Sequence, residues 1–188
     1  MPNWCEDELI VRGDKETLKK FREFAKGKHK AKLDFCAFIP YPKEYEELDE
    51  ACDETEKQIE EMTKKIQEAK TEEEKKRFEG LAKLIFQLRP KRDGYNSGGY
   101  EWCCANWGTK WNAKEVQVKE RERSLFYSFQ TAWSPPSPVV FAMSRAFPTL
   151  EFCLKFWERG VGYQGTYKIK AGKVLKDVSK EYRGSRGG

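Results

Sequence analysis

The sequence predicts an α+β protein whose antiparallel sheet is interrupted by a charged helical hairpin. Segments in which apolar and polar residues alternate predict strands, and segments with apolar residues every three or four positions predict helices. Between Lys43 and Arg92 the chain becomes dense in Glu and Lys, which marks a separate insertion. The length of 188 residues suits one domain that carries such an insertion.

The N-terminal part predicts the first strand and the first helix. Residues 3–11 alternate as a strand that ends at Gly13, and Asp14 is placed to cap the helix that follows. The apolar residues that share one face of this helix are Leu18, Phe21, Phe24 and Ala25. The apolar run at residues 33–39 closes on Pro40, which favours an extended segment or a short turn.

Residues 44–88 predict two helices that form an antiparallel hairpin. Ile59, Met62 and Ile66 make a narrow apolar stripe on the first helix. Thr71 is the expected N-cap of the second helix, and Glu74 completes a capping box. Such a hairpin is either a partner-binding arm or a solvated spacer packed on the domain, and the sequence leaves both open.

The second half of the chain predicts a β-hairpin, a helix and further strands. These are strands at residues 116–121 and 124–131, a helix at 135–146, a strand at 150–157, and two short strands at 166–169 and 173–174. Ser134 is the expected N-cap of the helix. The order β–α–insertion–β–β–α–β is the split β–α–β, ferredoxin-like arrangement. We expect a single ferredoxin-like domain over residues 1–182, with the helical insertion at about 44–90 and a disordered tail at 183–188.

The composition limits the classes of function. The net charge of +5 and the pI near 8.8 mildly favour an anionic partner, although basic surfaces of this strength often serve solubility alone. Residues 1–9 are polar and acidic, so no signal peptide is predicted, and no apolar run approaches the about 20 residues of a spanning helix. We therefore expect a soluble, cytoplasmic protein with no membrane partner.

No catalytic or metal-binding set is evident in the sequence. The single histidine, His29, lies in a Lys-rich loop, whereas a nucleophile pair would need it beside Cys or Ser in a cleft. The six cysteines show no CxxC spacing, so we expect free thiols, no metal and no cofactor. Acidic residues concentrate on the helical hairpin, where charge is usually solvated. We expect a protein that is not an enzyme.

Residues 94–111 form the most informative segment, because they combine five aromatic residues with four glycines. Large rigid side chains beside permissive backbone suit a contact surface, or one packed corner of the core. The glycine loop precedes a predicted short helix, whose first amides would attract an anion. Trp133 and Ser134 form a second candidate region, which a ferredoxin-like order can bring near the first. The predicted ligand-binding residues are Tyr95, Asn96, Ser97, Gly98, Tyr100, Trp102, Asn106, Trp107, Lys110, Trp111, Trp133 and Ser134.

Five motifs in one order resemble the YubB-like (Api-ninety-two-like) family. They are MPNWC at residues 1–5, FIPYP at 38–42, GYN at 94–96 with Trp102, NWGTKW at 106–111 and TAWSPP at 131–136. The family comprises uncharacterised proteins of phages, plasmids and pathogenicity islands that carry a ferredoxin-like domain. The resemblance covers residues 1–12 and roughly 35–172, and it implies that fold and a mobile-element accessory role. It implies no catalytic residues.

These observations favour a non-enzymatic accessory protein of a phage or mobile element in the cytoplasm of its bacterial host. It would bind a host component as a counter-defence factor, and its ligand would be a host protein or an anionic small molecule such as a nucleotide. The alternatives are a single-stranded nucleic-acid-binding protein, a scaffold that acts through the helical hairpin, and an unrecognised enzyme that uses Asn96, Glu101 or Ser134. Phe126, Tyr127 and Phe129 on one predicted strand faintly resemble RNA-recognition modules, but the signature run of those modules is absent.

Overall fold

The computed structural model describes residues 3–28 and 30–184. His29 and most of the predicted tail, residues 185–188, lie outside the described residues. The chain divides into two compact units: a sheet unit formed by Met1–Pro40 with Glu101–Gly188, and a helical unit formed by Tyr41–Tyr100. The expected insertion at about 44–90 lies within the helical unit.

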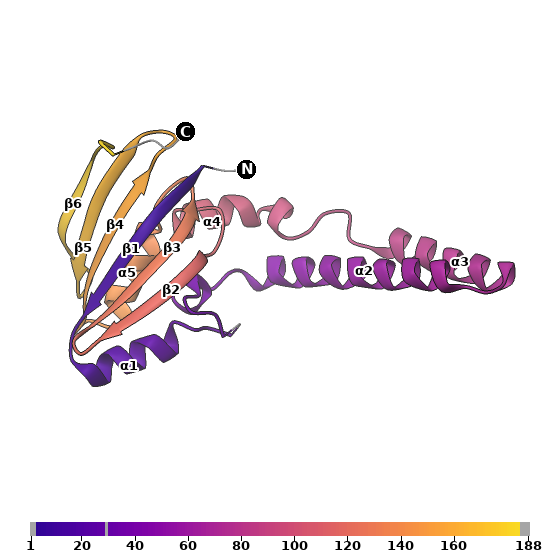
Figure 1. Ribbon diagram of the computed structural model, residues 1–188, viewed down its shortest axis with the longest axis horizontal. Coiled ribbons are helices and arrows are strands. Elements are labelled where there is room, and N and C mark those ends of the chain that lie inside the picture. The colour runs from indigo at the N-terminus through magenta and orange to yellow at the C-terminus, as the bar shows by residue number, and fades with distance from the viewer. Residues whose placement is uncertain (1–2, 29, 185–188) are drawn as a thin grey trace. The chain divides into compact units, whose positions relative to one another are not determined.

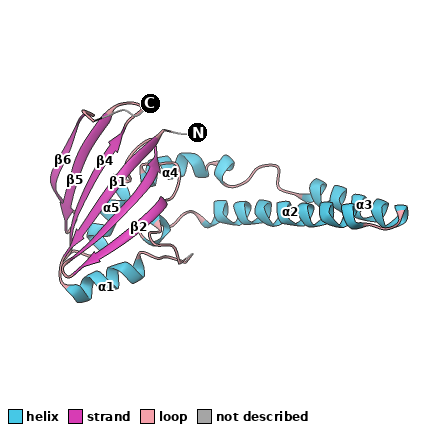
Figure 2. Ribbon diagram, viewed as in Figure 1, coloured by secondary structure: helices cyan, strands magenta, loops and turns pink. Residues whose placement is uncertain are grey.

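The sheet unit carries an antiparallel sheet in the order β2-β3-β1-β4-β5-β6 (Figures 1 and 2). The strands are β1 (Trp4–Arg12), β2 (Lys114–Arg121), β3 (Ser124–Ala132), β4 (Glu151–Glu158), β5 (Tyr163–Lys170) and β6 (Lys173–Glu181). The first four follow the ferredoxin-like order, which confirms the predicted fold class. The last two strands are longer than predicted, and they extend the sheet on the β4 side.

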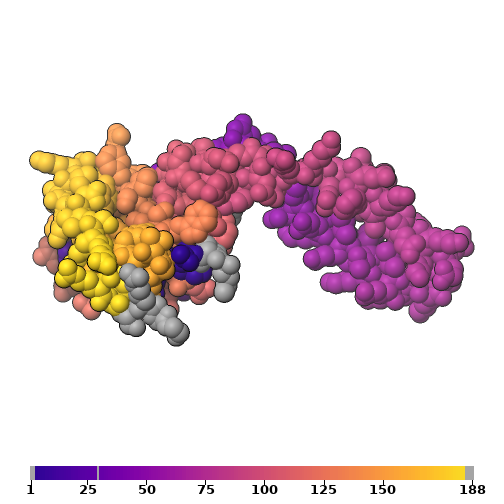
Figure 3. Space-filling view, turned by 90° about the horizontal axis from the view of Figure 1, so that it is seen from above, coloured from indigo at the N-terminus to yellow at the C-terminus, as the bar shows by residue number. Residues whose placement is uncertain are grey.

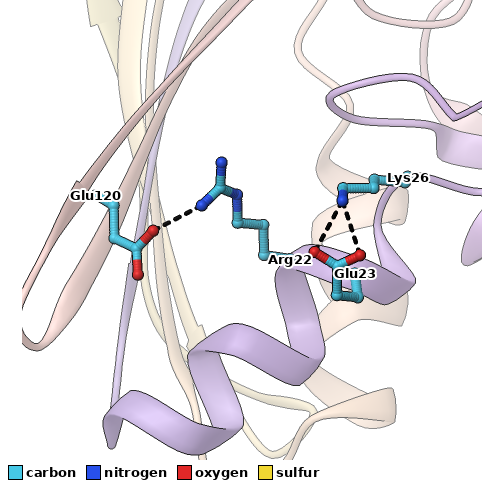
Figure 4. Close-up of polar contacts among 4 residues, drawn as sticks. All are labelled: Arg22, Glu23, Lys26 and Glu120. Carbon is cyan, nitrogen blue, oxygen red and sulfur yellow. Dashed lines mark hydrogen bonds and ion pairs between the residues drawn. The ribbon is translucent and has the colours of Figure 1, made fainter.

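Two helices of the sheet unit, α1 (Lys15–Phe24) and α5 (Ser137–Ala146), pack against the sheet, and α5 lies behind it in Figure 1. Asp14 caps α1 as predicted, since its carboxylate accepts a hydrogen bond from the Thr17 amide at 2.9 Å. An ion pair between Arg22 and Glu120, at 2.6 Å, also links α1 to β2 (Figure 4). The predicted turn at residues 33–39 is a short 3-10 helix, η1 (Phe35–Ala37).

The core lies between these helices and the covered face of the sheet. On β3, Tyr127 and Phe129 point into it and are buried, so the faint resemblance to an RNA-binding strand does not place these rings on the open face. Phe21 of α1 is fully buried, as predicted. The prediction for Phe24 is wrong in part, because its side chain is 48% exposed at the end of the helix.

The helical unit consists of α2 (Lys43–Glu68) and α3 (Glu72–Leu88), followed by the 3-10 helix η2 (Tyr95–Ser97). The predicted capping box is present: the Glu74 amide donates to Thr71, and the Glu74 carboxylate accepts from the Thr71 amide. Helix α4 (Gly99–Trp107) begins at the end of this unit. None of the described helices is long and apolar enough to cross a membrane.

Candidate functional site

Trp133, directly after β3, has an unusual backbone conformation and an exposed ring. Its φ is +72°, in the left-handed region that large side chains rarely adopt, and the residue is 45% exposed. Two hydrogen bonds hold it there. The Trp133 amide donates to the Asn3 carbonyl at 3.0 Å, and the Tyr163 hydroxyl donates to the Trp133 carbonyl. Strain of this kind costs about 1–3 kcal/mol and concentrates at functional sites.

The Lys110 ammonium lies between two indole rings. It is 4.2 Å from the centroid of the Trp111 ring and 4.0 Å from that of Trp133. The ring of Trp4 lies 5.9 Å from that of Trp111. No carboxylate of residues 3–28 or 30–184 forms an ion pair with Lys110. We call Trp4, Lys110, Trp111 and Trp133 the indole–lysine surface.

Hydrogen bonds to the preceding loop hold this surface in place. Thr109 donates its hydroxyl proton to the Ala132 carbonyl at 2.9 Å and accepts from the Ala132 amide at 3.1 Å. The Ser134 hydroxyl donates to the Gly108 carbonyl. The prediction that Ser134 caps α5 is therefore wrong: the N-cap is Pro136, which has no side-chain cap, and Ser134 instead ties the loop after β3 to the loop after α4.

A buried polar chain runs beneath the Trp133 loop. Asp7 and Thr131 are 1% and 0% exposed, and the Thr131 hydroxyl lies 2.6 Å from Asp7 Oδ2 and 2.8 Å from the Ser134 carbonyl. Burial raises the pKa of Asp7 well above its ordinary value, although the Thr131 hydrogen bond lowers it in part. The neighbouring Cys5 thiol points to Asp7 Oδ1 at 4.0 Å, and burial raises the pKa of this thiol too.

The glycine loop of the helical unit is arranged differently from the predicted anion site. The Tyr95 amide donates to Asp49 at 2.9 Å, and the Asn96 amide donates to Asp93 at 2.6 Å. The amides of Ser97 and Gly99 both donate to the Gly94 carbonyl at 3.0 Å. An anion would have to displace these bonds and approach two carboxylates.

The glycines of this loop serve packing. A Cβ at Gly94 would lie 1.9 Å from the Tyr45 carbonyl oxygen, so only glycine allows the loop to approach α2 so closely. A Cβ at Gly99 would lie equally close to the Tyr41 hydroxyl. The rings of Tyr95 and Tyr100 meet edge to face, with centroids 5.8 Å apart. Packing of aromatic residues was the competing interpretation of this segment.

Comparison with known proteins agrees with this fold. Residues 106–186 match the family model described as the ferredoxin-like domain in Api92-like protein. These residues are thus similar to the ferredoxin-like domain in Api92-like protein. The crystal structure of the protein Api92 from Yersinia pseudotuberculosis is similar over 98% of this chain and 99% of that one, with a TM-score of 0.54 and 12% identity, which shows the fold alone. Comparison with curated protein sequences gave no significant match.

Other predicted site residues, at the start of the matched segment and just before it, belong to the packing of the protein. Trp107 is 5% exposed, and its indole nitrogen donates to the Ile39 carbonyl at 2.9 Å. Trp102 packs edge to face on Trp107, with centroids 5.6 Å apart, and the Asn106 amide group donates to the Trp102 carbonyl. The structure thus brings together Lys110, Trp111 and Trp133 from the predicted set.

Two residues of β1, one at the indole–lysine surface and one buried beneath the Trp133 loop, were missed by sequence reasoning. Trp4 lies in a motif that the sequence singles out, but nothing in a strand pattern places its ring against Trp111. Asp7 lies among the apolar residues of β1 that face the core. The alternation of side chains along a strand would have predicted that Asp7 faces the core as well.

Proposed function

We propose that this chain is a non-enzymatic accessory protein of a phage or other mobile element, and that it binds an anionic ligand at the indole–lysine surface. The observation that carries the proposal is the Lys110 ammonium, which two indole faces hold without a carboxylate partner among the described residues. A positioned but uncompensated cation beside an exposed aromatic ring suits a ligand that has both a negative charge and a flat ring.

A nucleotide is the ligand class that best fits this pair of features. Its phosphates would accept hydrogen bonds from Lys110, which has three donors. Its base would stack on the exposed ring of Trp133, a contact that is worth about 1–3 kcal/mol in proteins that bind single strands. In the bacterial cytoplasm such binding would remove a host nucleotide from a defence pathway, which would be a counter-defence role.

The first test is calorimetric titration with ATP and with inorganic triphosphate, which lacks the base. Lys110→Met should weaken binding of both probes by about 10- to 150-fold, because a charge-assisted hydrogen bond contributes about 1.5–3 kcal/mol. Trp133→Gly should lower ATP affinity to that of inorganic triphosphate and leave the latter almost unchanged. Glycine is the matched replacement, since it adopts a φ of +72° without strain.

Lys114→Met provides the control, because Lys114 is an exposed lysine of β2. It removes the same charge and should leave both affinities within about twofold, as an exposed charge that does not contact the ligand is largely screened. The proposal is wrong if the wild-type protein binds neither probe, or if Lys114→Met and Lys110→Met weaken binding equally.

A second candidate function, a protein-binding scaffold, is favoured by one feature of the helical unit. Leu81, Leu84 and Leu88 are 40%, 50% and 76% exposed, and their spacing of three and four residues places them on one face of α3. The face toward α2 is formed by Phe78, Ala82 and Ile85, which are only half-buried. The leucine stripe is thus separate from the contact between the two helices.

If the stripe binds a protein, Leu84→Glu with Leu88→Glu should abolish capture of that protein from an extract of phage-infected bacteria. The double variant should retain its helix content by circular dichroism, because both side chains are already exposed. Lys83→Glu with Gln87→Glu, at exposed positions beside the stripe, should still capture the partner. Equal capture by the wild-type protein and the leucine double variant would exclude this function.

A further inference from the structure

The open face of the sheet carries a shallow hollow over β5. Its volume is about 260 Å³. Gln164 and Thr166 of β5 lie on its floor, and Lys155 and Trp157 of β4 line one side. Lys176 and Lys180 of β6 line the other side. All residues of β6 are exposed, and the strand belongs to the yellow part of the surface in Figure 3.

Positive charge dominates this hollow. It is lined by three lysines, Lys155, Lys176 and Lys180, and no carboxylate of the described residues lines it. Within the described part of the chain, none of these three ammonium groups forms an ion pair. Neighbouring cations behave differently: Lys168 pairs with Glu151 at 3.0 Å and Arg159 pairs with Glu6 at 2.9 Å.

Protection of a sheet edge does not account for this arrangement. Lysines on an edge strand do discourage pairing with another sheet, and that role suits Lys176 and Lys180 on β6. Lys155, however, lies on β4, between β1 and β5 in the interior of the sheet. In addition, Lys176 lies directly opposite Lys168 on β5, and like charges in a cross-strand pair are unfavourable. Glu151 compensates the charge of Lys168, so an anion in the hollow would compensate that of Lys176.

Trp157 adds an aromatic ring to the hollow. Its side chain is half-buried, and it makes no ring–ring contact with another aromatic residue of the described part of the chain. Its neighbours across the strands are Glu6, already paired with Arg159, and the neutral Gln164. An aromatic face beside unpaired lysines is the combination that binds bases and phosphates of a single strand.

We propose that this hollow binds single-stranded nucleic acid, with a base on Trp157 and the backbone phosphates on Lys155, Lys176 and Lys180. The lysines flank a central strand, so the two sides are about 10 Å apart, twice the spacing of neighbouring strands. Cations spread over that distance suit successive phosphates of a chain better than one small anion. This site is separate from the indole–lysine surface and does not depend on it.

The experiment measures binding of a fluorescein-labelled thymidine oligomer of about 12 nucleotides by anisotropy at several salt concentrations. Three lysine–phosphate contacts predict a slope of log K against log salt of about −2, which is a loss of about 20-fold between 50 and 200 mM salt. Lys176→Gln with Lys180→Gln should reduce the magnitude of the slope by about 1.4. Trp157→Leu should weaken binding by about 5- to 150-fold with the slope unchanged.

Lys15→Gln with Lys19→Gln is the matched control, because it removes the same charge from two exposed positions of α1. It should leave affinity and slope nearly unchanged. Absence of binding at low salt, or equal effects of the two lysine double variants, would overturn the proposal. So would a dimer, seen by analytical ultracentrifugation, that Lys176→Gln with Lys180→Gln dissociates, since a second copy of the chain would then occupy the hollow.

Discussion

Replacement of Asp7 by Asn is expected to stabilise the protein at neutral pH. The folded state raises the pKa of Asp7 by burial, so folding favours the neutral carboxyl group. The unfolded chain, in contrast, ionises this group at a pKa of about 3.9. In the wild-type protein, the free energy that neutral Asp7 contributes to folding is fully present when the pH is below about 3.9. This contribution is lost as the pH rises toward the raised pKa.

The hydrogen-bond chain shows why a neutral group fits this position. The Thr131 hydroxyl has one proton but two acceptors, Asp7 Oδ2 and the Ser134 carbonyl. When Asp7 is protonated, its carboxyl group can donate a hydrogen bond to the Thr131 hydroxyl, which then donates to the Ser134 carbonyl. All three groups then have a hydrogen-bond partner. When Asp7 is ionised, the Thr131 hydroxyl must donate its one proton to the carboxylate, so the Ser134 carbonyl loses its hydrogen-bond donor.

The measurement is the free energy of unfolding from urea titrations between about pH 4 and pH 8. The advantage of Asp7→Asn over the wild-type protein should grow by about 1.4 kcal/mol for each pH unit above about 4, up to the raised pKa. An identical pH dependence in both proteins would show that Asp7 is ionised at no cost.

Asp14→Asn provides a control with the opposite sign. Its hydrogen bonds with Thr17 lower the pKa of Asp14, so its contribution to stability is present above the ordinary pKa and is lost as pH falls through the lowered one. Asparagine is also a good N-cap, so the free energy of unfolding of this variant should differ little from that of the wild-type protein. The change affects only the exposed start of α1.

The sequence predicted correctly those features that depend on interactions between residues close together in the chain. The Asp14 cap and the capping box of Thr71 and Glu74 depend on residues three positions apart, and both are confirmed. The alternation of β1 likewise follows from burial of one face. By contrast, β6 has no buried residue, and its apolar residues do not alternate with polar ones. Its full length of nine residues could therefore not be predicted.

The candidate site depends on contacts between distant segments, and there the sequence was less informative. Ser134 has the right type and position for an N-cap, yet its hydroxyl bonds to Gly108, which is 26 residues earlier. Likewise, no propensity rule predicts a left-handed Trp133, since hydrogen bonds to Asn3 and Tyr163 impose it. The ferredoxin-like order predicted that Trp133 would lie near residues 94–111, but not that Lys110 would lie between the Trp111 and Trp133 rings. Trp102 and Trp107 of the same segment pack on each other, and Trp107 is buried.

Phe21→Ala should destabilise the protein strongly, by about 3–5 kcal/mol, because it empties the centre of an aromatic cluster. Phe21 is fully buried, and its ring centroid lies between 5.2 and 6.1 Å from four others. These are the rings of Phe38, Tyr127, Phe147 and Phe152. They come from the segment after η1, two strands of the sheet and the end of α5, so the cavity would open where all these elements meet.

Phe24→Ala is the matched control on the same helix. Its ring also meets Phe38 and Phe147, at 5.3 and 5.6 Å, but the residue is 48% exposed, so truncation leaves a notch that water can fill. We expect a loss of about 1 kcal/mol, measured like that of Phe21→Ala by urea unfolding of the whole chain. The sequence places both residues on one helix face, and only packing separates them. Equal losses for the two variants would mean that the helix end is buried to the same depth as its middle.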